Sequence, residues 1–509
     1  MKKNIEFILV ACCLLVAATS CSLDKDPLDT YSDVTEGIAA DTAQSSLKDK
    51  AAVLSQYQVI HDALRNNGQQ EWYLDLLLLS ETHADNAYSG NPGQETTPFE
   101  VNSIEGSNIN LKRDWERYMS FVAQANKLIC NIDKVEDAAL SDSERRRYKA
   151  EALIFRSMVY FDMVRIWGNV PLITTEAGDI TSENIEDVYP AYFPPQTATP
   201  EVYKQIESDL LEALPDAPAN NPADKTVFSK SVARTLLAKI YAEKPLRDYS
   251  KVIQYCDEVE ADGFDLVTDF SDLFGVVLED PSQPPGLGNQ AIETRQRNTV
   301  EAIYEAHYSV GSTNWTTWMF GRKMDEWNFY YDFAKWITPS RDLIKAFRNA
   351  GDTKRFNESV VYYECEWQVY YPADNYPFMY KCRSGFSSII KYRFADVLLM
   401  KAEALIMTGR SGEALPIINR IRLRAGLTVL ASVNIDTYLA ERRLELAFEG
   451  SRWFDLVRLD KVEEVLNSLT SRDEGRPALV YPYNEYSYLL PIPQAVMDQN
   501  PNLVQNDGY

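Results

Sequence analysis

The chain has 509 residues, of which 45% are hydrophobic and 25% are charged, a composition that fits a globular protein with a large core. Its net charge of −24 at pH 7 disfavours nucleic acid and anionic lipid as partners, because both carry negative charge. The seven cysteines form no C-x-x-C pair, which excludes a cysteine-based zinc framework and a disulfide-dense scaffold.

The chain starts with the layout of a secretory signal. Lys2 and Lys3 form a positive region, residues 8–18 are an apolar run too short to span a bilayer, and small residues lead to Cys21. A cysteine directly after a cleavage site resembles a bacterial lipoprotein signal, although Ala18 stands where such signals usually carry leucine. We therefore predict a lipid anchor at Cys21, since acylation holds a domain on a membrane. The alternative is an ordinary secretory signal with an unmodified Cys21.

Helical periodicity dominates the chain after a polar, Asp-rich tether over residues 21–45. The longest predicted helix covers residues 142–166. Gly168 and Pro171 follow it, and both are typical of the end of a helix. Alanines recur at turn spacing in several of these segments, so neighbouring helices can approach closely. The predicted helices cover residues 51–64, 71–79, 114–129, 142–166, 200–214, 233–243, 395–406 and 413–426.

The last two of these helices, joined at Gly409, resemble a tetratricopeptide hairpin. Pro416 is expected near the start of the second helix and Gly426 at its C-terminal cap. The spacing between such units is irregular, so we predict a mainly α fold with scattered hairpins rather than a regular repeat array.

Residues 265–392 differ from the helical regions, because they are rich in Gly, Pro, Asn and aromatic residues. Short strand-like pieces occur at 302–304 and 360–363. We predict that this part forms an irregular lobe with few short strands, set into the helical scaffold.

Residues 304–336 contain eleven aromatic side chains, four of them tryptophan, among Gly, Ser, Asn and Asp. An indole covers the apolar face of a sugar ring at low entropic cost, and nearby polar groups satisfy the sugar hydroxyls. The segment therefore indicates a glycan site, with Trp315 and Trp318 as the best stacking candidates and Trp327 and Tyr330 as further ones. The alternative is that these aromatics pack the core of the lobe, which we expect of Trp336.

A polar loop over residues 80–93 is a second candidate for the ligand site. Asp85, Asn86 and Tyr88 could line the same site from the other side, and a solvated surface loop is the alternative. His83-x-Asp85 is too little for a metal site, so we predict no metal and no cofactor.

The aromatic stretch 361–382 raises two smaller questions. Trp367 and Tyr371 are lesser ligand candidates. Cys365 and Cys382 could form a disulfide bond, but we expect buried free thiols, because an unpaired cysteine behaves as a small hydrophobic residue.

Six of the charged side chains in residues 441–459 lie mostly at i+3 or i+4 spacing, and two of these six could be mistaken for glycosidase carboxylates. We interpret the set as ion pairs that lock one helix to its neighbours. The sequence contains no G-x-S-x-G, H-E-x-x-H or P-loop motif, so we predict that the protein is not an enzyme. The six residues are Arg442, Glu445, Glu449, Arg452, Asp455 and Arg458.

Four stretches carry a resemblance to a known family: IFRSMVYFDMVRIWGNVPLIT (154–174), YRFADVLLMKAEALIMTGRSGEALPIINRIRLRAG (392–426), ERRLELAFEGSRWFDLVRL (441–459) and LLPIPQAVMDQNPNLVQNDGY (489–509). Together they resemble the SusD/RagB family, surface nutrient-binding lipoproteins of Bacteroidetes, over essentially the whole mature chain. The resemblance implies a mainly α-helical SusD-like fold with tetratricopeptide-like hairpins. It also implies a partner, a TonB-dependent SusC-like outer-membrane transporter.

On this resemblance we expect a signal peptide at residues 1–20, a tether at 21–45 and a single SusD-like domain at 46–509. The expected function is capture of an oligo- or polysaccharide by a lipid-anchored protein on the outer face of the outer membrane, for delivery to the transporter. Capture of peptides by a RagB-type lipoprotein is the main alternative. A purely structural adaptor and a hydrolase are further alternatives.

Overall fold

The computed structural model describes residues 47–66, 68–90, 93–177, 184–278, 291–294, 297–309, 312–319, 336–365 and 369–509. The predictions for the signal peptide, the tether, Cys21, Trp327, Tyr330 and Trp367 lie outside these residues.

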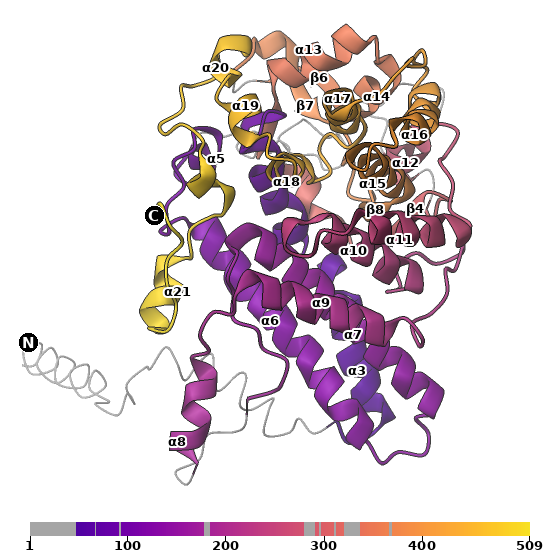
Figure 1. Cartoon of the computed structure of the whole chain (residues 1–509), viewed down its shortest axis with the longest axis vertical. Coiled ribbons are helices and arrows are strands. Elements are labelled where there is room, and N and C mark those ends of the chain that lie inside the picture. Colours follow the sequence, from indigo (N-terminus) through magenta and orange to yellow (C-terminus); the bar gives the residue numbers. More distant parts are fainter. Residues whose placement is uncertain are drawn as a thin grey trace, which may run out of the picture.

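Helices make up most of the described chain, as the sequence predicts (Figure 1). The lower half in this view holds the long helices α6 and α7, and the lobe with α13, α14, β6 and β7 lies at the top. The α-helices of the first half are α3 (Lys50–His61), α4 (Ala63–Asn66), α5 (Thr97–Glu100), α6 (Ile109–Asn131), α7 (Asp142–Trp167), α8 (Ile185–Val188), α9 (Thr199–Ala213), α10 (Lys230–Ala242) and α11 (Tyr249–Ala261). Those of the second half are α12 (Ser271–Phe274), α13 (Arg341–Ala350), α14 (Thr353–Ser359), α15 (Phe394–Met407), α16 (Ser411–Arg424), α17 (Ile435–Glu445), α18 (Arg452–Arg458), α19 (Val462–Leu466), α20 (Leu469–Arg472) and α21 (Gln494–Gln499).

Helix α7 is the central helix of the scaffold and begins and ends where local sequence dictates. Ser141 and Glu144 form a capping box at its start, and Gly168 ends it with a φ of 71°. The prediction of a helix over 142–166 is confirmed. Almost every residue after Ala150 is buried, because α7 packs against α6 on one side and α9 on the other.

Neighbouring helices pack as hairpins, α10 with α11 and α15 with α16, and α11 also packs against α15. The tight turn between α15 and α16 places Gly409 at a φ of 78°, and Gly426, after α16, also has a φ of 78°. The predicted hairpin is therefore confirmed. Pro416 lies in the second turn of α16 rather than in its first.

The described strands form four two-stranded antiparallel sheets, which confirms an irregular lobe with few short strands. β1 pairs with β5, β2 with β3, β4 with β8 and β6 with β7. The strands are β1 (Ala87–Ser89), β2 (Val276–Leu278), β3 (Ala291–Thr294), β4 (Ala302–Ala306), β5 (Ile337–Pro339), β6 (Val360–Tyr363), β7 (Tyr376–Met379) and β8 (Ile389–Arg393).

Two predicted helices differ from the structure. The segment predicted as a helix over 71–79 winds largely as two π-helical stretches, Gln70–Asp75 and Leu78–Thr82. The single helix predicted over 441–459 is wrong, since α17 and α18 are separated by a turn with positive φ at Phe448 and Gly450. At Gly450 a Cβ atom would lie 2.6 Å from the side chain of Leu76, so this turn requires glycine.

Candidate functional site

Asn314 fixes the start of the aromatic segment. Its backbone N–H donates to the carbonyl of Gly385 over 2.7 Å, and its side-chain amide donates to the carbonyl of Ser387 over 2.9 Å. Its Oδ1 accepts from the N–H of Thr316 at 3.2 Å and from its Oγ1 at 2.5 Å, which starts the 3-10 helix Trp315–Met319. Asn314 and Thr316 are buried, so these polar groups serve the interior of the protein and not a ligand.

Trp315 is half-buried and packs against the main hydrophobic core, as does Met319 at the other end of this 3-10 helix. The indole is therefore held in place on one side while part of it remains accessible, which is the arrangement that a stacking side chain needs. Trp318 belongs to the same helical turn.

Trp336 anchors the aromatic segment to the helical scaffold. Its indole Nε1 donates to the carbonyl of Leu74 over 3.0 Å, and its backbone N–H donates to the carbonyl of Met319 over 2.6 Å. The side chain is 8% exposed. The prediction that Trp336 is structural is confirmed.

Residues 80–90 of the predicted loop are not a solvated surface segment, because all of them are buried, with Asp85 completely so. Both Asp85 carboxylate oxygens accept from Arg452, at 2.8 and 2.9 Å, and Arg472 donates to Oδ2 at 3.1 Å. Arg443 also lies 3.4 Å from Oδ2. Burial alone would raise the pKa of Asp85, but these arginines outweigh it and hold the pKa far below its usual range.

Asn86 is buried next to Asp85 and has internal partners of its own. Its amide donates to Glu81 over 2.6 Å, and its Oδ1 accepts from Arg443 over 2.7 Å. Glu81 in turn accepts from the backbone N–H groups of Phe448 and Gly450, each at 3.1 Å. The 80–90 segment therefore holds the turn between α17 and α18, which accounts for its polar residues without a ligand.

Tyr88 is buried in β1, and its hydroxyl donates to Asp473 over 2.5 Å. Its ring stacks on Tyr370, with centroids 4.3 Å apart and an interplanar angle of 18°. Tyr370 and Tyr371 are half-buried, and the guanidinium of Arg341 lies 4.4 Å above the Tyr371 ring. The structure thus places Tyr88 behind a pair of partly exposed tyrosines. Tyr370 was missed in the sequence, although it lies in an evidently aromatic stretch.

Asp85, Asn86 and Tyr88 are therefore placed in the interior and not beside Trp315 on an open surface. The physical reason is that their partners come from the C-terminal third of the chain, Arg443, Arg452, Arg472 and Asp473. We leave these three residues out of the candidate site and keep Trp315 on its 3-10 helix as the main candidate, with the half-buried Tyr370 and Tyr371 as a separate aromatic pair.

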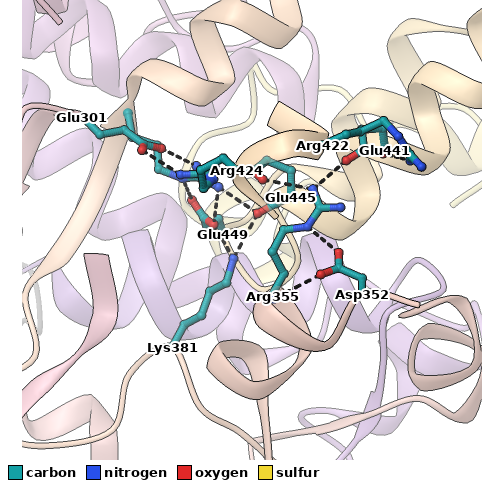
Figure 2. Close-up of polar contacts among 10 residues, drawn as sticks. Glu301, Asp352, Arg355, Lys381, Arg422, Arg424, Glu441, Glu445 and Glu449 are labelled. Atoms are coloured by element: carbon teal, nitrogen blue, oxygen red, sulfur yellow. Dashed lines mark hydrogen bonds and ion pairs between the residues drawn. The ribbon is translucent and has the colours of Figure 1, made fainter. Parts of the chain in front are cut away.

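A buried network of charged side chains joins the lobe to the scaffold (Figure 2). Glu445 is at its centre, because Arg355, Arg393 and Arg424 all pair with its carboxylate. These arginines outweigh the effect of burial, which alone would raise the pKa, and hold the pKa of Glu445 well below its usual range. The acidic members are Glu301, Asp352, Glu441, Glu445 and Glu449, and the basic ones are Arg355, Lys381, Arg393, Arg422 and Arg424.

Glu445 and Glu449 have the partners of structural groups and not of catalytic carboxylates. Glu445 is completely buried, and Glu449 pairs with Arg393 and Lys381. The interpretation of residues 441–459 as ion pairs that lock to neighbouring elements is confirmed, although their partners lie mostly on other elements.

Two family models match the chain. Residues 383–509 match the model described as "SusD family", and residues 30–242 match the model described as "Starch-binding associating with outer membrane". The chain belongs to the SusD/RagB family.

Named relatives of this SusD/RagB protein support the same assignment. It is 26% identical to SusD-like protein P38 of Formosa agariphila, over 84% of this chain and 86% of that protein. It is 22% identical to starch-binding protein SusD of Bacteroides thetaiotaomicron, over 81% of each chain. The fold is similar to that of surface glycan-binding protein A from Bacteroides thetaiotaomicron in complex with laminarihexaose, with a TM-score of 0.69 at 19% identity, covering 90% of this chain and all of that one.

His83 in this SusD/RagB protein is a buried packing residue. Its Nδ1 lies 2.9 Å from the carbonyl of Phe99, and its ring packs against Trp453 with centroids 4.1 Å apart. Burial lowers the pKa of His83 to about 4, so the ring is neutral at pH 7. Within the described ranges no group of three or more His, Cys, Asp or Glu side chains could hold a metal ion.

A polar cavity of about 70 Å³ lies between α7, α10, α15, α17 and α18. Ion pairs line it, among them Lys391 with Asp162 at 2.9 Å and Arg442 with Asp455 at 2.6 Å. Trp315 is not among its lining residues, and its charged groups pair with one another, so it offers no free polar groups for a sugar.

Cys365 and Cys382 are buried and are not joined by a disulfide bond, as expected. In the part of the chain that the structure describes, no helix has both the length and the apolar character needed to cross a bilayer.

Proposed function

We propose that this SusD/RagB protein captures oligo- or polysaccharides at the cell surface and delivers them to a TonB-dependent SusC-like transporter. The observation that carries the proposal is Trp315, an indole that the core holds on one side while part of it stays accessible, in a protein of this family. One relative is named for starch binding, and a protein of similar fold is described in complex with laminarihexaose.

The chemistry of the candidate site suits a sugar. The half-buried Trp315 offers a flat apolar ring with little rotamer entropy to lose on binding. Such a ring matches the C–H side of a pyranose ring. Tyr370 and Tyr371 are weaker candidates, because Tyr88 stacks on the first ring and the Arg341 guanidinium lies over the second. Trp318, Trp327 and Tyr330 remain proposed members of this site on the strength of the sequence.

We further propose that Cys21 carries a lipid anchor and that the protein faces the cell exterior on the outer membrane. The apolar leader before Cys21 supports the anchor, and the polar stretch after it supports a tether between the membrane and the described domain. A non-enzymatic role is consistent with the paired, buried state of Glu445 and Glu449.

Calorimetry with a panel of malto-, laminari- and other oligosaccharides tests glycan capture. We expect the wild type to bind at least one of them and Trp315→Ala to lower its affinity about tenfold or more, the cost of losing one stacking contact. Tyr481→Ala is the matched control, because Tyr481 is an aromatic residue that is 62% exposed and outside the site. Unchanged binding by Trp315→Ala would remove the site assignment, and binding of peptides in place of glycans would favour the RagB-type alternative.

A further inference from the structure

Three long segments of the chain contain no lysine or arginine, although the whole chain has 51 of these residues. At the average frequency, each segment would contain several. Exposure to water gives no reason to exclude basic side chains, because most lysine and arginine residues of folded proteins are exposed. Their absence therefore needs another explanation. The segments are residues 66–111, 166–203 and 477–509.

The structure brings these three segments together on one side of the molecule. The backbone N–H of Val480 donates to the carbonyl of Val101 over 2.8 Å, and the side-chain amide of Asn500 donates to the carbonyl of Pro194 over 2.9 Å. In Figure 1, α5, α21 and the C-terminus lie on the left side of the molecule, with α8 below them. We call the outer parts of the segments, residues 93–109, 184–203 and 477–509, the cation-free face.

The cation-free face exposes large apolar side chains to solvent. Tyr481 is 62% exposed and Val504 is 70% exposed. Ile109, Val480 and Tyr486 are also exposed by more than half. Tyrosine is enriched in the buried centre of protein–protein interfaces, and lysine is depleted there. The composition of this face is therefore closer to that of a protein interface than to that of an ordinary solvent-exposed surface.

Acidic side chains on the same face have no basic partner. Four of them are exposed, and within the described part of the chain none forms an ion pair. Two basic residues next to the face already have acidic partners, since Lys112 lies 3.6 Å from Glu116 and Lys204 lies 2.7 Å from Glu201. The face therefore has a negative potential that a basic partner would complement. The four exposed acids are Glu105, Glu485, Asp498 and Asp507.

We propose that the cation-free face is the surface by which the protein docks on its transporter, and that the transporter presents lysine and arginine side chains around apolar ones there. A second copy of the chain would bring acids against acids, and an anionic lipid surface would be repelled. A basic and partly apolar protein surface complements both features of the face.

The identity of the partner rests on the proposed function, whereas the chemistry of the face does not. Trp315 lies outside the cation-free face. The transporter and a glycan therefore do not compete for the same side chains, and loss of docking can be measured separately from loss of glycan binding.

The test is co-purification of the affinity-tagged full-length protein from detergent-solubilised outer membranes of the cells that produce it. Mass spectrometry identifies and quantifies the TonB-dependent transporter that is recovered. One face variant combines Tyr481→Ala with Val504→Ala, and the other combines Glu485→Lys with Asp507→Lys. We expect each to recover about tenfold less transporter than the wild type, the loss typical of one interface hot spot.

Matched control variants change exposed residues of the same kinds outside the face. Leu423→Ala combined with Val429→Ala removes two apolar side chains that are each exposed by more than half. Glu413→Lys reverses the charge of an exposed acid on α16. We expect both controls to recover as much transporter as the wild type. Because all the changed side chains are exposed, we expect every variant to keep the Tm of the wild type.

The outcomes separate this inference from the proposed function. Equal recovery of the transporter with the wild type and with both face variants would overturn the inference and leave the proposed function in place. Recovery of a second copy of this chain instead of a transporter would also overturn it. A wild type that recovers no transporter would overturn both the docking face and the proposed delivery. Loss of the transporter from the face variants alone, in a protein that binds no glycan by calorimetry, would support the docking face and refute glycan capture.

Discussion

Arg393, the last residue of β8, donates through Nη1 to Oε1 of Glu445, the last residue of α17, over 2.6 Å. Both side chains are almost completely buried. This pair joins the lobe to the helical scaffold at a point where neither charge can be solvated by bulk water.

Glu445→Gln is expected to destabilise the protein strongly. The amide cannot neutralise Arg355, Arg393 and Arg424, and breaking a buried ion pair by changing one partner typically costs about 3–5 kcal/mol. Urea denaturation at pH 7 measures the change in the free energy of unfolding. The control is Glu413→Gln, because Glu413 pairs with Arg410 on the surface. If Glu445→Gln lowered the free energy of unfolding as little as Glu413→Gln does, the central role of Glu445 would be contradicted.

Asp85→Asn is expected to lower stability at neutral pH and to lose this effect in acid. The native arginines hold the pKa of Asp85 below its unfolded value, so the stabilisation is fully present above about pH 4 and falls as the pH drops toward the native pKa. The difference between wild type and variant, about 3 kcal/mol at pH 7 for a broken buried pair, should therefore shrink below about pH 4. Denaturation curves from acid to neutral pH check this, and a difference that grows in acid would contradict it.

Glu71→Gln is expected to act in the opposite direction. Burial raises the pKa of Glu71 to about 7, so the wild type loses stability as the pH rises from about 4.5 to 7, where the folded chain must give up its proton. A glutamine removes this cost. The free energy of unfolding of the variant, relative to that of the wild type, should therefore be up to about 3 kcal/mol higher at pH 8 than at pH 4. Thermal or urea unfolding at the two pH values measures it. An equal difference between wild type and variant at both pH values would contradict the prediction.

Gly450→Ala and Gly409→Ala form a matched pair. Both glycines have φ near 78°, but a Cβ at Gly450 would lie 2.6 Å from Leu76, whereas nothing lies within 4 Å at Gly409. We expect a cost of about 1 kcal/mol at Gly409 from backbone conformation alone, and a clearly larger cost of about 2–4 kcal/mol at Gly450. Equal losses in denaturant unfolding would show that the close approach to Leu76 is not needed.

The helices could be predicted from sequence because their signals are local. Ser141, Glu144 and Gly168 fix the ends of α7 by contacts within a few residues. Trp336 was also interpreted correctly as structural. The prediction of one helix over 441–459 failed because carboxylate oxygens of Glu81, far away in sequence, accept from the N–H groups of Phe448 and Gly450 and stabilise a turn there.

The candidate site was harder to predict for the same reason. Asp85 is part of a polar loop by composition, and only the arrival of Arg443, Arg452 and Arg472 from the other end of the chain turns it into a core residue. Composition marked the aromatic segment, but which face of Trp315 is held by the core depends on the tertiary fold.

The network in Figure 2 has a consequence for how the protein can change over generations. Replacing any one of its acidic residues leaves a guanidinium or ammonium group buried without its counter-ion. A substitution in this network is therefore tolerated only together with a second, compensating one. Loops that end in solvent are free of this requirement. The buried network at the base of the lobe is therefore constrained in sequence, whereas the solvent-exposed loops of the lobe can vary. Single substitutions in those loops can change ligand preference without a change of fold.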